Sequence, residues 1–435
     1  MLSRLLLRHI FAFFGKRTEK KFRVTFTRGP GYSNFSTGAA DIHILFKNRR
    51  AEWRSLLFFY HGLIESYIEG DVDIIAEKPL QTLADMGRSV LADKQGDSQK
   101  TLVLFNPIAR ARMLFQEWRQ DNFTHAQAKK NAEFHYGLDP RFFELMLERT
   151  VGYSEGYWTE NTKTLDQAKV NNYEYICRKL RLKPGDKVVE VGSGWGFLPI
   201  YMVKNYGVSV TVYNPVRRQN EYMRARFLQH GVSDKITLIE GDHRDIGQHK
   251  EQFDKYVSIG VYEHVGYRKR QYHSWLKSIA ECLKPEGTGF ISTTTFMHRG
   301  FTEFLVLKYI FPGGHIPSLP LTLETMERCG LTLVEVENLW MHYQKTLAAW
   351  RDNVYEHWPE MHAVDPAVFD ESFRRKWLMY LEGTVDVFAK GMDLSHILFI
   401  KGRDPNLYPW VRDEFHKKSR FVEGDSKPEC YGLST

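Results

Sequence analysis

The sequence predicts an α/β protein built around a doubly wound, mostly parallel sheet. Short apolar runs typical of buried strands recur between residues 187 and 294, and helix-length segments separate them. A glycine-rich turn follows the first of these runs. The 435 residues are enough for such a domain and for a second, smaller unit.

Five strands are expected in this region, at residues 187–191, 208–212, 236–239, 256–259 and 289–294. Val and Ile are frequent in these runs, as they are in strands buried on both faces. Ligands of such sheets bind outside the carboxyl ends of the strands. The residues that follow each strand are therefore the first candidates for a binding site.

Residues 1–125 are predicted to form a separate N-terminal domain. Ile42, Ile44 and Phe46 alternate with polar residues and predict a strand, and a helical pattern covers residues 53–67. Residues 92–100 are polar without periodicity, which predicts an exposed loop. The main domain is expected at residues 126–405, where Asp139 should cap a helix that starts at Pro140. Residues 406–435, with the basic run at 417–420, are expected to form a solvated tail.

The first fourteen residues combine Leu and Phe with Arg and His. This run is too short and too interrupted to span a bilayer, and it lacks the uncharged core and cleavage site of a signal peptide. It suits an amphipathic helix at a membrane surface. It suits equally a helix that packs on its own domain, and both alternatives remain open.

Charge and cysteine content narrow the class of protein. The net charge of +7 indicates an anionic partner, either nucleic acid or a membrane surface. No aromatic-basic motif of the RNA-binding type is present, so nucleic acid is not expected. The four cysteines, Cys177, Cys282, Cys329 and Cys430, include no CxxC pair. This spacing argues against a zinc site or a disulfide framework and fits a reducing cytosol.

The motif EVGSGWG at residues 190–196 lies directly after the first strand of the main domain. Gly192 and Gly194 let the backbone turn tightly and approach a ligand. The spacing differs from the dinucleotide pattern GxGxxG, and Glu190 suits the amino group of a ligand better than a pyrophosphate. The motif therefore favours S-adenosylmethionine (SAM) over NAD.

Polar residues follow the next two strands. Asn214 and Gln219 could bond ribose hydroxyls, at the strand end where many nucleotide folds place a carboxylate. Asp242 could accept the adenine amino group, or it could be the N-cap of a helix, and spacing alone does not decide between these roles.

Several strings within residues 130–403 resemble the cyclopropane-fatty-acyl-phospholipid synthases and the related mycolic-acid methyltransferases. They are GYSEGYW at 152–158, the glycine-rich turn, VSIGVYEHVG at 257–266, LKPEG at 283–287, KYIFPGG at 308–314, and Tyr343 with TLAAW at 346–350. The GxxEHVG and KYIFPGG strings are specific to this family among methyltransferases. The segment YIEGDVD at 67–73 resembles the accessory domain of the longer members that act on phospholipids.

The resemblance implies a Rossmann-like class I methyltransferase with a mostly parallel seven-stranded sheet and a smaller N-terminal accessory domain. It implies SAM as the cofactor, and it places Glu263 and Tyr343 at catalytic positions. In this family the alkene attacks the sulfonium methyl, and a bound bicarbonate then removes a proton from the new methyl and closes a cyclopropane ring. Together with Glu190, the expected cofactor contacts are Tyr153, Ser154, Gly192, Gly194, Asn214, Gln219, Asp242 and His243.

This sequence departs from the family at two positions of the bicarbonate site. Glu155 replaces a cysteine, and residues 292–294 are Ser-Thr-Thr where the family has a histidine. An anion would be disfavoured beside a new carboxylate. We therefore expect Glu155 to be the base and bicarbonate to be unnecessary, unless Glu155 only pairs with a basic side chain. The product is then a methylated unsaturated chain, which we favour slightly, or a cyclopropane.

Two further motifs have alternative interpretations. His264 beside Glu263 is expected to orient other groups rather than to act as a base, and no second ligand pair at HExxH spacing indicates a metal. The turn at residues 311–314 could gate the substrate or be an ordinary turn.

The predicted function is carbon transfer to unsaturated acyl chains of phospholipids, by a cytoplasmic protein held peripherally on the inner face of the membrane. A homodimer is left open. The rival functions are a small-molecule amine N-methyltransferase of the same family and a catalytically dead lipid-binding relative. The accessory domain and the basic N-terminus favour lipid over amines, and the intact glycine turn with Glu263 and Tyr343 argues against a dead enzyme.

Overall fold

A computed structural model of the chain describes residues 2–91, 107–298, 302–403 and 412. The expected loop at 92–100, Cys430 and nearly all of the expected C-terminal tail lie outside the described residues. The chain forms two compact units, each of which is described by itself below.

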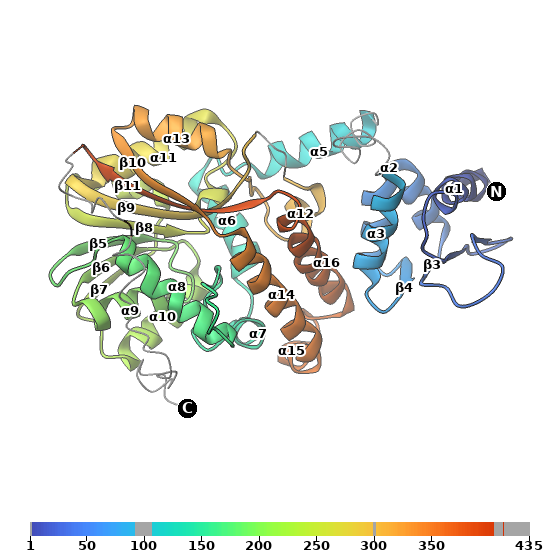
Figure 1. Cartoon of the computed structure of the whole chain (residues 1–435), viewed down its shortest axis with the longest axis horizontal. Coiled ribbons are helices and arrows are strands. Elements are labelled where there is room, and N and C mark those ends of the chain that lie inside the picture. The colour runs from blue at the N-terminus through green and yellow to red at the C-terminus, as the bar shows by residue number, and fades with distance from the viewer. Residues whose placement is uncertain (1, 92–106, 299–301, 404–411, 413–435) are drawn as a thin grey trace. The chain divides into compact units, whose positions relative to one another are not determined.

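The larger unit contains a seven-stranded sheet with the order β10-β11-β9-β8-β5-β6-β7 (Figure 1). The strands β7, β6, β5, β8 and β9 run parallel, whereas β11 pairs antiparallel with both β9 and β10. The predicted fold class is confirmed, and each of the five predicted strands coincides or overlaps with an observed one. The strands are β5 (Lys187–Val191), β6 (Ser209–Tyr213), β7 (Ile236–Ile239), β8 (Phe253–Ile259), β9 (Leu283–Thr295), β10 (Leu331–Asn338) and β11 (Asp393–Lys401).

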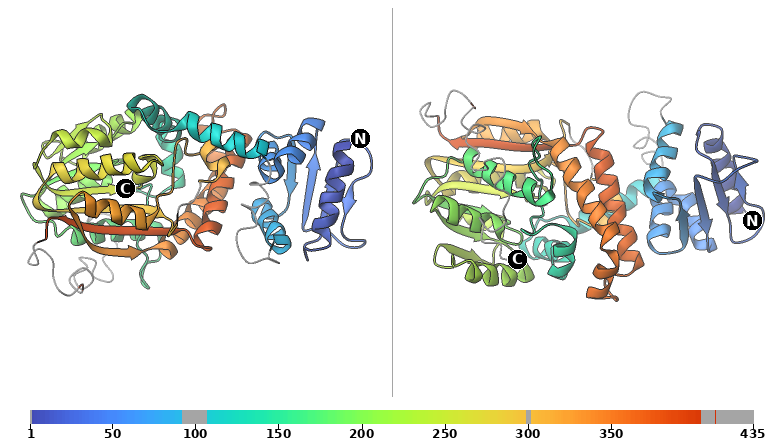
Figure 2. Two further views of the ribbon diagram at one scale, coloured as in Figure 1. Left: turned by 90° about the horizontal axis from the view of Figure 1, so that it is seen from above. Right: turned by 60° about the horizontal axis from the view of Figure 1, so that its bottom comes forward.

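Helices cover both faces of this sheet (Figures 1 and 2). Adjacent strand residues alternate between two apolar cores, as the pleat requires: Val188 belongs to one core and Val189 to the other. The first core includes residues of α8 (Leu165–Lys179), α9 (Phe197–Tyr206) and α10 (Arg217–Gln229), and the second includes residues of α11 (Lys269–Cys282) and α13 (Leu319–Arg328). Burial on both faces explains why the strands are apolar throughout.

The larger unit contains further helices. Asp139 caps α7 (Pro140–Met146) by accepting a hydrogen bond from the backbone of Arg141, with Pro140 in the first turn, as predicted. The other elements are α6 (His125–Tyr136), the 3-10 helices η1 (His243–Gln248) and η2 (Tyr262–His264), α14 (Trp340–Glu356) and α15 (Trp358–Val364).

The smaller unit has a four-stranded sheet with the order β2-β1-β3-β4. The predicted strand at Ile42, Ile44 and Phe46 is β3, and the helical pattern at 53–67 falls within α2. The elements are α1 (Leu2–Gly15), β1 (Phe22–Thr25), β2 (Tyr32–Ser33), β3 (Ile42–Phe46), α2 (Arg49–Ile68), β4 (Val72–Ile75), α3 (Pro79–Leu91), α5 (Pro107–Gln120), α12 (Phe304–Tyr309) and most of α16 (Glu371–Phe388).

The division between the units differs from the predicted boundary at residue 125. The smaller unit comprises Met1–Arg119 together with two later segments, Glu303–Ile310 and Asp365–Gly383. Ion pairs join these segments to the N-terminal part: Lys308 binds the buried Glu65 at 2.6 Å, and Arg375 binds Asp73 at 3.0 Å. A prediction made along the chain misses such partners because they are some 240 to 300 residues apart.

Helix α1 packs on its own unit, as one of the two alternatives for the first residues predicts. Leu7 and Phe11 are buried against the rest of the smaller unit, and Glu52 accepts hydrogen bonds from Ser3 and Arg4. A second set of apolar side chains on the same helix is exposed: Leu2, Leu5, Leu6 and Phe13. No helix within the described residues combines the length and the hydropathy that a membrane span needs.

Candidate active site

The turn between β5 and α9 holds three glycines in the left-handed region, with φ of 72° at Gly192, 59° at Gly194 and 84° at Gly196. Side chains other than glycine rarely adopt this conformation. A Cβ atom on Gly192 would also stand 2.3 Å from a methyl group of Val261, whereas the space around Gly194 is open. Glycine is therefore required at Gly192 for conformation and for space.

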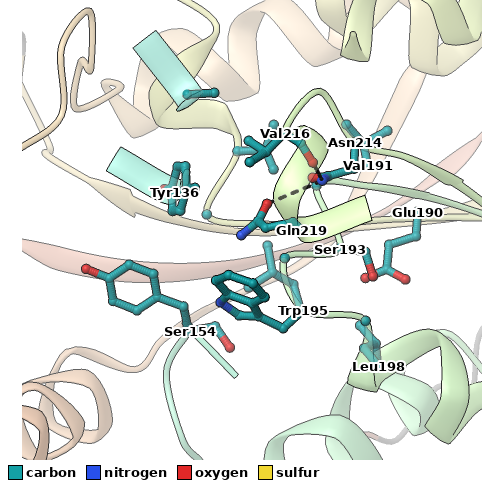
Figure 3. A pocket seen from close by; sticks show the side chains of 18 of the residues that line it. Tyr136, Ser154, Glu190, Val191, Ser193, Trp195, Leu198, Asn214, Val216 and Gln219 are labelled. Carbon is teal, nitrogen blue, oxygen red and sulfur yellow. Dashed lines mark hydrogen bonds between the residues drawn. The ribbon is translucent and has the colours of Figure 1, made fainter. Parts of the chain in front are cut away.

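This turn forms one wall of a cavity of about 1100 Å³, its open mouth included. The cavity lies where the sequence predicts it, beyond the carboxyl ends of β5, β6 and β8. All nine residues expected to contact the cofactor line it: Tyr153, Ser154, Glu190, Gly192, Gly194, Asn214, Gln219, Asp242 and His243. The side chains of Glu190, Ser154 and Gln219 appear around this cavity in Figure 3.

Glu190 is almost fully buried, and its Oε2 atom has no hydrogen-bond partner among the described residues. Burial raises the pKa of this carboxyl to about 8, and only the nearby Ser193 hydroxyl opposes the shift. Unpartnered buried oxygens are rare in native proteins because they are costly. Glu190 is thus equipped to accept a hydrogen bond from a ligand.

Asn214 and Gln219 form one polar group at the end of β6. The Asn214 amide donates to Gln219 Oε1 at 3.3 Å (Figure 3). It also donates to Asn220 Oδ1 at 2.9 Å. Both side chains are buried at the cavity wall. Their orientation is therefore fixed before a ligand binds.

Asp242 combines the two roles that its spacing left open. It lines the cavity and also caps η1, where it accepts hydrogen bonds from the backbone and the guanidinium of Arg244. Burial opposes ionisation of Asp242, but His243 and Arg244 together hold its pKa well below the usual range. Burial lowers the pKa of His243 to about 4, so this imidazole is neutral at pH 7.

The segment that carries Tyr153 and Ser154 is anchored by two buried charged side chains. Glu148 accepts hydrogen bonds from the backbone of Thr150 and Gly152, and Lys169 donates to the carbonyl and hydroxyl oxygens of Ser154 at 2.8 and 2.6 Å. Burial raises the pKa of Glu148 and lowers that of Lys169 to about 8. Neither anchor was predicted, because nothing in the local sequence distinguishes them from surface charges.

His264 lines the cavity beside Tyr136, whose hydroxyl lies 3.1 Å from His264 Nε2. Burial lowers the pKa of His264 to about 4, so a neutral imidazole fits the orienting role predicted for it. The ring of Phe311 lies 5.9 Å from that of His264.

Tyr136 and Asn122 also line the cavity and were not predicted. The Phe-His-Tyr run at residues 134–136 is the only local signal that could have indicated Tyr136.

Glu263 does not line this cavity. Its Oε1 atom accepts hydrogen bonds from the backbone and the hydroxyl of Thr294, both at 2.7 Å. Its Oε2 atom is buried without a hydrogen-bond partner among the described residues, and burial raises the pKa of the carboxyl.

Glu155 lies beside the same strand, β9. Its Oε1 atom is 2.8 Å from His396 Nε2 and accepts hydrogen bonds from Ser292 at 2.9 Å and Asn172 at 3.2 Å. Ser292 and Thr294 are two residues apart, so their side chains project from the same face of the sheet. Glu155 and Glu263 therefore accept hydrogen bonds from side chains on one face of β9. Neither carboxyl group lines the cavity, but the adjacent residues Ser154 and His264 do.

Tyr343 lies one aromatic layer away from the cavity. Its ring centroid is 6.0 Å from that of Trp350 on the same helix, α14, and 5.0 Å from that of Phe388. Trp350 in turn lies 5.1 Å from Tyr153, which lines the cavity. The described residues thus link Tyr343 to the cavity through aromatic packing.

The family model of mycolic acid cyclopropane synthetase matches residues 123–397, more than half of the chain. A probable fatty acid methyltransferase of Pseudomonas putida is 32% identical over 307 residues, which cover 68% of this chain and 75% of the relative. This chain belongs to the mycolic acid cyclopropane synthetase family.

Two further members agree with this assignment. The cyclopropane-fatty-acyl-phospholipid synthase of Escherichia coli is 32% identical over 65% of this chain and 71% of its own length. The structure of the mycolic acid cyclopropane synthase CmaA1 in complex with SAH and CTAB superimposes with a TM-score of 0.58 and 26% identity, covering 63% of this chain and 98% of that one. The chain is accordingly a SAM-dependent methyltransferase of the cyclopropane-synthase type.

The cavity fits this cofactor. The unpartnered Oε2 atom of Glu190 offers an acceptor for the amino group of SAM, and the open space at Gly194 leaves room for a ligand against the turn. The neutral, polar wall formed by Asn214 and Gln219 suits ribose hydroxyls. When bound, SAM supplies an electrophilic methyl group on a sulfonium.

Proposed function

We propose that this family member transfers the methyl carbon of SAM to the double bond of an unsaturated acyl chain of a phospholipid. The proposal draws its substrate class from the relatives named for fatty acids and for acyl phospholipids. Its second step rests on the residues of this chain. Glu155 takes the place of bicarbonate as the base that removes a proton from the methylated carbocation.

The observation that carries the second step is the hydrogen bond from Ser292 to Glu155 at 2.9 Å. By the resemblance, Glu155 stands where the family carries the cysteine of its bicarbonate site, and Ser292 belongs to residues 292–294, where the family carries the histidine. A carboxylate held there supplies the negative charge and the acceptor oxygens that bicarbonate would otherwise provide. Because a second anion beside it would be repelled, we propose that bicarbonate is not required.

Glu263 is assigned to the first step. An alkene is a weak nucleophile, so the enzyme gains rate by orienting it and by stabilising the positive charge that develops on its carbons. A buried carboxylate with one oxygen fixed by Thr294 and the other unpartnered provides such stabilisation. Trp350 packs against Tyr153, which lines the cavity, and Tyr343 packs against Trp350. These aromatic side chains exclude water that would react with the carbocation.

The position of the base decides the product. Removal of a proton from the transferred methyl group forms a new C–C bond and a cyclopropane. Removal of a proton from a chain carbon next to the cationic carbon forms a methylated alkene. A methylene-bearing chain would require a hydride shift onto the cationic carbon before the transferred methyl group loses its proton. We favour the methylated unsaturated chain, because the change from cysteine to Glu155 alters the group that abstracts the proton.

The direct test uses the purified full-length chain with SAM and vesicles of phospholipids that carry single double bonds at different positions. Released fatty acids are analysed by mass spectrometry before and after hydrogenation. We expect a gain of one CH2 on the acyl chain, and uptake of hydrogen by the product identifies the methylated alkene. Transfer to small amines but not to lipid would overturn the substrate class.

The base is tested separately in bicarbonate-depleted buffer. The wild-type rate should persist without bicarbonate, and Glu155→Gln should lower it strongly while leaving SAM binding unchanged in calorimetry. A rate that depends on added bicarbonate, or a fully active Glu155→Gln, would reject Glu155 as the base without affecting the proposed substrate.

We further propose that the protein acts peripherally at the cytoplasmic face of a membrane. The exposed Leu2, Leu5, Leu6 and Phe13 of α1 lie close in sequence to Arg8 and to the basic pairs Lys16-Arg17 and Lys20-Lys21. Apolar side chains with nearby cationic groups bind the interface of anionic bilayers. Sedimentation with anionic and with neutral vesicles tests this association.

A further inference from the structure

Residues 292–294 of this chain are Ser-Thr-Thr where the family carries a histidine after LKPEG, yet the structure supplies a histidine from the neighbouring strand. His396 on β11 stands directly opposite Ser292 on β9 in the antiparallel register. Its side chain is fully buried. The two side chains share one face of the sheet and both contact Glu155.

The hydrogen bonds define the roles of the atoms. An ionised carboxylate only accepts hydrogen bonds, so the proton of the neutral imidazole must be on Nε2, which donates to Glu155 Oε1 at 2.8 Å. Ser292 and Asn172 donate to the same oxygen. Three donors on Oε1 fix the orientation of the carboxylate and leave Oε2 outside this network.

The charged and polar groups around Glu155 and His396 favour the ionised form of Glu155. Burial would by itself raise the pKa of Glu155, but the hydrogen bond donated by His396 and the charge of Lys169 lower it. Burial lowers the pKa of His396 despite its bond to Glu155, so this imidazole is neutral at pH 7. The other charged or titratable groups that act on the pair are Lys179 on α8, Glu337 on β10 and His342 on α14.

We infer that His396 is a positioning residue that replaces the family histidine from a different strand and keeps Glu155 ionised and oriented for proton removal. This inference rests on the proposed role of Glu155. The step is balanced. A C–H bond breaks either on a chain carbon beside the cationic carbon or on the transferred methyl group, its electron pair forms the new C=C bond or the ring-closing C–C bond respectively, and the proton goes to Glu155 Oε2. A weak base suffices because a carbocation is a very strong acid, but a protonated carboxyl could not act at all.

The inference predicts a change in the pH profile. Replacing His396 by Phe removes the donor while the site stays buried, so the pKa of Glu155 should rise. A carboxyl with a raised pKa is lost as a base when the pH falls through that value. The rate of His396→Phe relative to wild type should therefore fall between pH 8 and pH 5.5, by about tenfold for each unit by which the raised pKa of Glu155 exceeds the assay pH.

Three variants make the test decisive. His396→Gln retains an N–H donor and should largely preserve the wild-type profile. Ser395→Ala removes the buried hydrogen bond of the adjacent residue to Thr295 on the other face of β11, and it controls for damage to the strand. Thermal unfolding and SAM binding establish that each variant is folded.

The outcomes separate the two proposals. If Glu155→Gln is inactive in proton removal but His396→Phe loses rate equally at all pH values, His396 has only a structural role and the inference is overturned. If Glu155→Gln is fully active, the base assignment itself fails. A pH-dependent loss in His396→Phe with recovery in His396→Gln supports both.

Discussion

Glu190 and Glu155 are two almost fully buried carboxyl groups of the same unit whose pKa values move in opposite directions. Burial raises the pKa of Glu190 to about 8, whereas His396 and Lys169 overcome the same effect at Glu155 and lower its pKa to about 2. The difference lies in the donors. Glu155 receives three hydrogen bonds on one oxygen, while Glu190 keeps an unpartnered oxygen at the cavity wall.

Glu190 and Glu155 represent two kinds of site beside one sheet, a cofactor site and a proposed proton-removal site. The cofactor site is left unsatisfied, so that binding a ligand supplies the missing hydrogen bonds. The proposed proton-removal site is satisfied in advance by the protein, which keeps its charge independent of the ligand. Four changes test this distinction, in order of decreasing expected effect.

The largest effect is expected at Glu263, which resembles Glu190 in its unpartnered oxygen but is assigned to catalysis. Glu263→Gln keeps the shape and an acceptor for Thr294 but removes the charge that stabilises the cation. The rate should fall on the order of 100- to 1000-fold, with little change in SAM affinity. A loss of SAM affinity of similar size would instead place Glu263 in the cofactor site.

The second change concerns the glycine turn beside Glu190. In Gly192→Ala the new Cβ meets Val261 at 2.3 Å, and the φ of 72° is unfavourable, which together should weaken SAM binding at least about tenfold. Calorimetry measures the affinity. Gly231→Ala is the matched control, because Gly231 has a φ of 66° but open space around it. Because Gly231 does not line the cavity, equal loss of SAM affinity in both variants would mean that the substitutions disturb the fold generally and that the glycine turn is not the specific cause.

The third change is the pH dependence of cofactor binding. With a pKa of about 8, Glu190 is mostly protonated at pH 7 and must release its proton when it pairs with the amino group of SAM. Binding should therefore release close to one proton at pH 7 and strengthen as the pH rises toward 8. Calorimetry in buffers of different ionisation enthalpy measures the release.

The control for this effect is Glu190→Gln, in which the release should disappear. The same shift affects the ligand-free protein, because a raised pKa stabilises the folded state below the ordinary value of 4.5 and this contribution is lost as the pH rises through about 8. Glu155, with its lowered pKa, contributes in the opposite direction, and its contribution is lost only in strong acid.

The smallest effect on catalysis is expected far from both carboxylates, on α1. Leu5→Ser with Leu6→Ser changes two exposed side chains, so the free energy of unfolding should change by less than about 0.5 kcal/mol per site. Binding to anionic vesicles should decrease. Leu7→Ser, which alters a buried neighbour, should instead destabilise the smaller unit by about 2 kcal/mol or more. Unchanged vesicle binding in the double variant would remove α1 from the membrane-binding surface.

The sequence by itself determined the fold class, the five strands that it located, and a set of nine residues that meet at one cavity. Tyr153, Ser154 and His243 were expected only from the resemblance to the family, whereas the other predictions succeed because their signals are local. Strand burial appears as runs of Val and Ile, and parallel strands bring the residues after their carboxyl ends to one edge. Glu190, Asn214 and Asp242 each lie at or just after the end of a strand, so their place in the site could be predicted without knowledge of distant contacts.

Only the tertiary structure decided what surrounds Glu155. Its partner His396 is 241 residues away in the sequence, on a strand that inverts direction relative to most of the sheet. The antiparallel register sets His396 opposite Ser292, and no local pattern encodes that pairing. The same limit applies to Lys308 and Arg375, which join the smaller unit from late in the chain. The charge of a buried group depends on its neighbours in space, and those neighbours exist only once the chain has folded.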